Sequence, residues 1–140
     1  MNLDLRHDAR GFSLIELLVV VLIVGTLAGI ALPLFLRQQE KGQDAAAQSA
    51  AKNLVTLVEA CVAGGSTYTS CDTAPDIEAD PASLGTDRGK ARITDATAAG
   101  FTVIAYSRSG NTFTTVRSGG TFNRTCSISG RGGCSDTGSW

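Results

Sequence analysis

The chain contains a single histidine, His7, among its 140 residues. Histidine is the usual general base beside a serine or cysteine nucleophile and a common zinc ligand. His7 precedes a long apolar run, in a segment that we expect to be removed. The remaining chain would then contain no histidine for Ser/His or Cys/His catalysis or for a His-based metal site. We therefore predict that the protein is not an enzyme and needs no cofactor and no metal.

The chain also lacks an excess of charge of either sign, with 12 basic and 13 acidic residues. This balance argues against attachment to nucleic acid through bulk charge, although a local basic patch remains compatible with it. Four aromatic residues lie among basic residues in the C-terminal half, but such residues are more typical of a core than of a base-stacking surface. They are Phe101, Tyr106, Phe113 and Phe122. We do not expect nucleic acid as a partner.

Large aliphatic residues are few downstream of Gly64, where Gly, Ser and Thr dominate. A small domain with so thin a core often needs covalent support. Four cysteines can supply it as two disulfides, for which three pairings exist. We expect the local pairs, Cys61 with Cys71 and Cys126 with Cys134, while a buried free thiol is the alternative for Cys61. Zinc is not expected, because no CxxC pair is present.

One long apolar run is present, and it contains a carboxylate near its start. The residues from Leu17 to Leu36 are uncharged, and at about 1.5 Å per residue they are long enough to cross a hydrocarbon core of about 30 Å. A plain membrane anchor or a secretory signal peptide would also contain such a run, although signal peptides usually have only about 7–15 apolar residues. A charge in lipid is costly and usually marks a function. Without cleavage, Glu16 would merely lie at the headgroup level near Arg10, but that alternative leaves the Gly11–Phe12 junction and Pro33 unexplained.

The helical pattern continues beyond the apolar run. Gly25 and Gly29 form a small-xxx-small pair that favours close helix packing in lipid, and with Pro33 they equally favour a kink or a loosened turn. Apolar residues then recur at steps of three or four until Gly64 and Gly65 end the helix. This predicted apolar stripe consists of Ala47, Ala50, Leu54, Leu57 and Cys61.

The remaining residues predict a loop followed by a sheet. Residues 66–90 contain Pro75, Pro81 and several Asp and Gly, as is typical of a loop. Runs of β-branched and aromatic residues at 101–107, 111–117 and 121–128 predict strands joined by hairpin turns, with 91–94 as a further candidate strand. We expect an α+β fold in which the second half of a long N-terminal helix packs on a three- to four-stranded antiparallel sheet, followed by a glycine-rich C-terminal loop.

The segment RGFSLIELLVVVLIVGTLAGIALP, residues 10–33, resembles the N-terminus of the type IV pilins and of the pseudopilins of type II secretion. The resemblance consists of a short polar leader that ends in Gly11, an aromatic Phe12, a carboxylate four residues later at Glu16, and Pro33. It implies four segments: a leader at 1–11, a transmembrane and filament-core helix at 12–36, its soluble amphipathic half at 37–63, and a globular loop-and-sheet domain at 64–140 with a C-terminal disulfide loop.

The resemblance also implies roles for the matching residues. Prepilin peptidase would cut between Gly11 and Phe12 on the cytoplasmic side and methylate the new amine of Phe12. Glu16 would pair with that amine, in a neighbouring subunit or in its own. The helix would loosen between Gly25 and Pro33. An assembly ATPase and a platform membrane protein would extract subunits from membrane lipid into a helical filament of identical or related subunits.

The expected function is therefore that of a structural subunit of a type IV pilus-like surface filament. The subunit would cross the cytoplasmic membrane once, with its N-terminus in the cytoplasm, and would be extracellular after assembly. The alternatives are a pseudopilin of a type II secretion or DNA-uptake machine and a monomeric membrane-anchored extracellular binding domain. The sequence does not distinguish a major from a minor subunit.

Charge in the C-terminal part of the chain is unevenly distributed. An acidic loop around Asp72 and residues 76–80 resembles a calcium loop, but it lacks the glycine turn and the terminal glutamate of an EF-hand, and we expect it to be solvated. Residues 59–87 contain only acidic charges, whereas residues 88–140 are mainly basic. Ordinary surface variation would explain this difference, and so would complementary contacts between neighbouring subunits.

Overall fold

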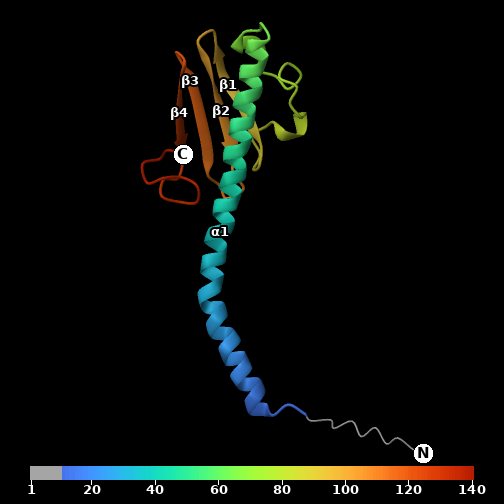
Figure 1. Cartoon of the computed structure of the whole chain (residues 1–140), viewed down its shortest axis with the longest axis vertical. Helices are drawn as coiled ribbons and strands as arrows, with labels where there is room; N and C mark the ends of the chain where they lie inside the picture. Colours follow the sequence, from blue (N-terminus) through green and yellow to red (C-terminus); the bar gives the residue numbers. More distant parts are fainter. Residues whose placement is uncertain (1–10) are drawn as a thin grey trace, which may run out of the picture. The chain divides into compact units, whose positions relative to one another are not determined.

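The computed structural model describes residues 11–140, so residues 1–10 of the predicted leader, including His7, lie outside the described residues (Figure 1). The chain divides into two units, of which the first ends at Leu36 and the second runs from Arg37 to Trp140.

One helix, α1 (Leu14–Ala63), supplies part of each unit. It begins after Ser13, whose hydroxyl accepts a hydrogen bond of 3.2 Å from the backbone N–H of Glu16. This is the usual way in which a serine satisfies a free N–H group at a helix start. The helix ends at a glycine pair, where Gly65 has a φ of 101°, a left-handed conformation that glycine adopts without strain.

The second unit contains a four-stranded antiparallel sheet in which sequential strands are neighbours. Its strands are β1 (Ala91–Thr97), β2 (Gly100–Tyr106), β3 (Thr112–Ser118) and β4 (Thr121–Cys126). Gly119 and Gly120, both with positive φ, form the tight turn between β3 and β4, as the right-handed strand twist favours in a two-residue hairpin. The predicted α+β fold is confirmed, with four strands.

Two strand predictions were wrong in their limits. β1 extends past Thr94 to Thr97 through a register shift in its pairing with β2. Asp95 in this shift has a φ of 53°, so the strand continues through a bulge that breaks the side-chain alternation used to predict strands. β4 ends at Cys126, not at residue 128. The Ser127 N–H still donates to the Thr112 carbonyl of β3, whereas the Ile128 N–H donates to the side chain of Asn111 instead of a strand carbonyl.

The core lies between the sheet and the part of α1 that belongs to the second unit. Phe101, Val103 and Phe113 are buried on the sheet side. The helix contributes residues at steps of three and four: Ala47, Ala51, Leu54 and Val58. The predicted stripe was therefore partly wrong, since Ala50, Leu57 and Cys61 are only partly buried at its margin.

The loop between α1 and β1 is held to this core at a few points. It contains two short 3-10 turns, Tyr68–Ser70 and Pro81–Ser83. A disulfide joins Cys61 near the end of α1 to the buried Cys71, and Ile77 is buried further along. In Figure 1 this loop lies on one side of α1, while β3, β4 and the C-terminal tail lie on the other.

Candidate functional site

The junction between Gly11 and Phe12 lies before the first helical residue. Residues 11–13 have no regular secondary structure, and 84% of the Phe12 side chain is exposed. A peptidase binds its substrate as an extended chain, so a bond outside the helix is accessible without unfolding. The predicted cleavage site therefore lies where a peptidase could reach it.

Glu16 lies in the first turn of α1, four residues after Phe12. Ser13 and Glu16 have the spacing of a capping box, of which the structure contains the hydrogen bond from the Glu16 N–H to the Ser13 hydroxyl. A carboxylate is also favourable at this end of a helix, where free N–H groups create partial positive charge. The sequence analysis missed the role of Ser13, although the [ST]-x-x-[DE] pattern before an apolar run would have predicted it.

The apolar run of the first unit is not covered by any other part of residues 11–140. From Leu17 to Leu36 the large apolar side chains are between 45% and 76% exposed. By length and composition, the helix is long and apolar enough to cross a membrane. A continuous apolar surface of this size needs lipid or other helices to cover it.

Three residues in this run were singled out for helix loosening. Gly25, Gly29 and Pro33 all lie within α1, which is helical at each of them. No atom lies within 4 Å of the position that a Cβ would take at either glycine, so both positions are open to a close neighbour. Loosening on assembly stays a prediction.

A row of polar residues on α1 binds the C-terminal loop, and the sequence analysis missed it. The Asp44 carboxylate, only 1% exposed, accepts hydrogen bonds from the Ser107 hydroxyl at 2.6 Å, the Ser109 hydroxyl at 2.5 Å and the Gly133 N–H at 2.9 Å. One turn further on, the Gln48 amide donates to the Gly133 carbonyl at 2.8 Å. The helix, the β2–β3 loop and the C-terminal loop therefore meet at one buried carboxylate.

One turn before Asp44, Glu40 forms a two-pronged ion pair with Arg131. The Arg131 Nε and Nη2 atoms lie 3.1 and 2.5 Å from the two carboxylate oxygens. The hydrogen bond from Arg131 lowers the pKa of Glu40, and the same bond raises the pKa of Arg131. The ion pair therefore holds the C-terminal loop most firmly when Glu40 is ionised.

The C-terminal loop is also closed covalently. A disulfide joins Cys126 at the end of β4 to Cys134, with 5.8 Å between their Cα atoms. Cys134 is buried next to Gly133, so the disulfide and the Asp44 hydrogen bonds act on the same short segment. All four cysteines are paired, and none is left as a nucleophile or metal ligand.

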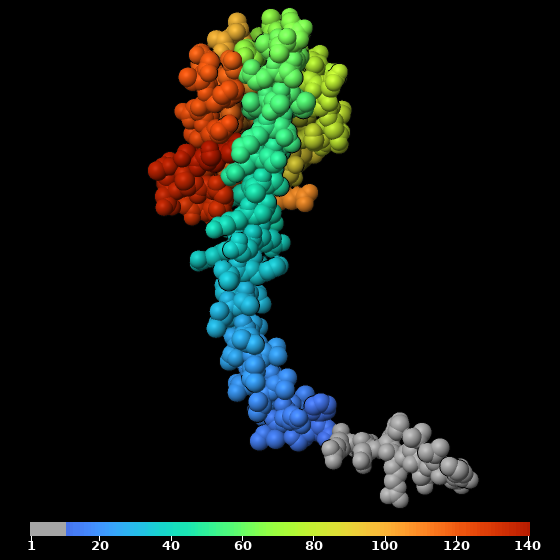
Figure 2. Space-filling view, viewed as in Figure 1, coloured from blue at the N-terminus to red at the C-terminus, as the bar shows by residue number. Residues whose placement is uncertain are grey.

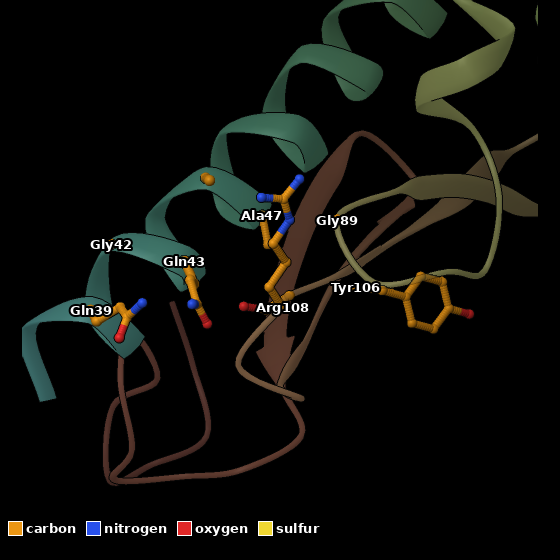
Figure 3. Close-up of a pocket in the computed structure, with 9 residues that line it drawn as sticks. Gln39, Gly42, Gln43, Ala47, Gly89, Tyr106 and Arg108 are labelled. Carbon is orange, nitrogen blue, oxygen red and sulfur yellow. The ribbon is translucent and has the colours of Figure 1, made fainter. Parts of the chain in front are cut away.

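An open groove of about 550 Å³ lies between α1 and the β2–β3 loop. Figure 3 shows Gln39 and Gln43 on α1 and Arg108 on the loop around it, with the Tyr106 ring turned away. The groove contains no pair of groups suited to acid–base or nucleophilic chemistry. Within residues 11–140, no group of three or more His, Cys, Asp or Glu residues is placed to hold a metal ion.

Residues 6–32 match the family model described as the prokaryotic N-terminal methylation motif. The chain is 37% identical over 62 residues to the type IV major fimbrial protein FimA of Dichelobacter nodosus. These residues are 44% of this chain and 40% of that protein. It is 47% identical over 47 residues to the type IV major pilin protein PilA of Myxococcus xanthus. These residues are 34% of this chain and 21% of that protein.

A fimbrial protein of Pseudomonas aeruginosa is 37% identical over 71 residues, which cover 51% of this chain and 46% of that protein. The matches thus span less than half the length of these relatives. No solved structure matches the chain.

Each of these relatives is named as a pilin or fimbrial protein, which supports the prediction that the chain is not an enzyme. The N-terminal part of the chain is therefore similar to type IV pilins, and the long N-terminal helix with its antiparallel sheet agrees with the pilin-like fold predicted from the sequence.

Proposed function

We propose that the protein is a structural subunit of a type IV pilus-like surface filament, made as a precursor and polymerised through its N-terminal helix. The observation that carries this proposal is the uncovered apolar surface from Leu17 to Leu36, with a single carboxylate, Glu16, at its start. Lipid covers such a surface in the free subunit, and the same helices of neighbouring subunits cover it in a filament.

Cleavage after Gly11 gives Glu16 a partner. The new amine of Phe12 is then four residues away, so both members of a charge pair lie at the same depth. Each charge alone is costly in an apolar environment, and pairing offsets that cost. If the amine of one subunit pairs with the Glu16 of another, the pairing selects one stagger between neighbouring helices. Methylation of the amine leaves its positive charge in place.

The proposal assigns partners that act before and during assembly. Prepilin peptidase cuts the leader and methylates Phe12, an assembly ATPase supplies the work of extraction, and a platform membrane protein presents the subunit. Before assembly the subunit crosses the cytoplasmic membrane once, with its N-terminus in the cytoplasm. After assembly the helices are in the filament core and the sheet domains are outside.

Mass spectrometry of filaments sheared from the cell surface tests this proposal. We expect the chain among the sheared proteins, starting at Phe12 and carrying one added methyl group on its amine. A start within residues 29–32 would indicate a secretory signal peptide and overturn the proposal. A methylated chain confined to the cell envelope, and absent from sheared material, would indicate a pseudopilin.

A further inference from the structure

Charge in the second unit is separated onto two surfaces. The first, which we call the acidic loop, is the segment Asp72–Asp80, whose exposed carboxylates belong to Asp72, Asp76, Glu78 and Asp80. The ion pairs among residues 11–140 join Asp87 to Lys90, Glu59 to Arg117, and Glu40 to Arg131. None of them involves the acidic loop, so no ion pair within residues 11–140 neutralises its charge.

The acidic loop is held in place by the core. Ile77 in its middle is buried, and Cys71, immediately before it, is fixed by the disulfide to Cys61. Asp76 accepts a hydrogen bond from the Thr73 hydroxyl, and Asp80 accepts one of 2.9 Å from the Ala82 N–H. A partner would therefore meet carboxylates on a fixed backbone, which reduces the ordering cost of binding.

The second surface, which we call the basic–aromatic strip, lies between α1 and β4. Trp140 packs edge-on against Phe113 with 5.6 Å between ring centroids, and its indole N–H donates to the Thr114 carbonyl. The Lys52 ammonium and the Arg124 guanidinium lie 5.6 and 5.5 Å from the Trp140 ring. The strip consists of Lys52, Phe122, Arg124 and Trp140.

The cations of the strip have no carboxylate partner in the described part of the chain. Neither Lys52 nor Arg124 takes part in an ion pair there. Phe122, beside them on β4, has 45% of its side chain exposed, although its neighbour Arg117 lies 5.7 Å from its ring. The strip therefore offers unpaired positive charge next to exposed aromatic surface, which suits an acidic partner.

The two surfaces lie on opposite flanks of α1. The acidic loop borders a groove together with Ala50, Asn53 and Leu57. Lys52 lies about 100–160° around the helix from these three residues, at 3.6 residues per turn, so its side chain leaves the helix away from the groove. Figure 2 shows the loop, in yellow-green, on one side of α1 and the red C-terminal segment on the other. A single copy therefore cannot bring its own loop to its own strip.

We propose that the acidic loop of one copy docks on the basic–aromatic strip of the neighbouring copy. This inference rests on the proposed function, because it needs copies held side by side. Two different surfaces of the same chain make a heterologous contact, which repeats from copy to copy and forms an open filament unless it closes into a ring. Opposite charges favour the correct neighbour, and like charges oppose reversed orientations.

Crosslinking of sheared filaments with a carbodiimide, which joins a carboxylate directly to a lysine amine, tests the contact. We expect a dimer band in which Lys52 is bonded to Asp76 or Glu78. The matched control is Lys52→Arg, which keeps the charge but has no reactive amine, so it should form filaments and lose this crosslink. Crosslinks from the acidic loop to Lys41 or Lys90, with none to Lys52, would overturn the proposal.

Charge reversal gives an independent test. Filament yield should fall at least about tenfold for Lys52→Glu with Arg124→Glu, and equally for Asp76→Lys with Glu78→Lys, because like charges then face each other. All four changes in one chain restore complementarity and should restore most of the yield. Arg108→Glu, an exposed cation outside the strip, should have no effect. Normal membrane levels of each variant verify that it folds.

The outcomes separate this inference from the proposed function. If the unaltered chain is absent from sheared filaments, the proposed function itself fails. If the unaltered chain forms filaments and both reversed pairs form them equally well, only the docking contact is wrong. A third outcome concerns single-stranded DNA. If the strip binds it, and if the double variant Lys52→Glu with Arg124→Glu loses this binding but still forms filaments, the strip is a nucleic-acid surface and the docking proposal is wrong.

Discussion

The Asp44 carboxylate on α1 accepts a hydrogen bond from the Gly133 backbone N–H, 2.9 Å away and 89 residues later in the sequence. Two serine hydroxyls of the β2–β3 loop, from Ser107 and Ser109, donate to the same carboxylate. A single buried side chain therefore orders two segments at one end of the sheet domain. Such a group stabilises the fold only while its hydrogen bonds are complete.

Asp44→Ala should destabilise the domain by about 3 kcal/mol, because it leaves the donors of Ser107, Ser109 and Gly133 without their acceptor. Denaturant unfolding of the full chain in detergent micelles, followed by the fluorescence of Trp140, the single tryptophan, measures the loss. Ser109→Ala is the control, since it removes only one of the donors to Asp44, together with a 3.2 Å acceptor of the Asn111 N–H, and should cost about 1 kcal/mol. Equal losses for the two variants would contradict the central role of Asp44.

Gly132→Ala tests the close approach of the C-terminal loop to α1. Gly132 has a φ of 61°, and a Cβ there would overlap the Asp44 carboxylate. Gly119 has a similar φ of 55° with open space around it. Both substitutions impose backbone strain, but only Gly132→Ala adds a clash, so it should lower stability by about 1–2 kcal/mol more than Gly119→Ala. Equal unfolding midpoints would show that the loop does not contact Asp44.

The ion pair of Glu40 and Arg131 should make the attachment of the C-terminal loop dependent on pH. The pKa of Glu40 is lower in the folded state than in the unfolded state. Its stabilisation is therefore complete above the unfolded value of about 4.3 and is lost as pH falls through the folded value. Arg131→Gln should reduce stability at neutral pH, and the difference from the unaltered chain should shrink as pH falls below about 4.3 and Glu40 becomes protonated. A stability difference that does not shrink as pH falls would show that the Glu40–Arg131 ion pair is not its cause.

The disulfides can be tested by peptide mapping without reduction. We expect peptides that join Cys61 to Cys71 and Cys126 to Cys134. Each closes a short loop, so Cys126→Ser should cost about 2–3 kcal/mol and loosen the C-terminal loop. Alkylation of all four thiols in unreduced protein would contradict both bridges, and a peptide that joins Cys61 to Cys134 would contradict the pairing.

The sequence predicted those elements that depend on local pattern. The apolar run, the glycine end of α1 and the glycine turn at 119–120 are each specified by neighbouring residues. Helical periodicity also predicted the correct side of α1, but it placed the centre of the apolar stripe about one residue away from Ala51 and Val58, the most deeply buried positions. Small side chains such as alanine mark such a stripe only weakly.

The sequence could not predict elements that depend on distant partners. Asp44 looks like an ordinary polar residue on a helix, because its donors lie 63 to 89 residues away. Trp140 follows a glycine-rich segment typical of a loop, yet it packs on Phe113 between Lys52 and Arg124. In both cases tertiary contacts determine what the side chain binds, and the neighbouring residues in the sequence do not predict these contacts.

Glu16→Ala should prevent filament assembly without preventing membrane insertion. The insertion cost of a carboxylate disappears, so the amount of membrane-bound subunit should stay the same or rise. Cleavage after Gly11 should persist, because the bond that is cut lies several residues away and outside the helix. Assembly should fail because the Phe12 amine then lies in an apolar environment without its partner, which typically costs about 3–5 kcal/mol.

The conservative variants separate charge from shape. Glu16→Asp keeps the charge on a shorter side chain and should retain part of the assembly, whereas Glu16→Gln keeps the shape without the charge and should assemble poorly. Counts of sheared filaments, together with the amount of membrane-bound subunit and the N-terminal residue of each variant, measure the three effects separately. Normal filaments from Glu16→Ala would mean that the carboxylate does not set the stagger between subunits. A mature chain that is no longer cleaved would instead assign Glu16 to recognition by the peptidase.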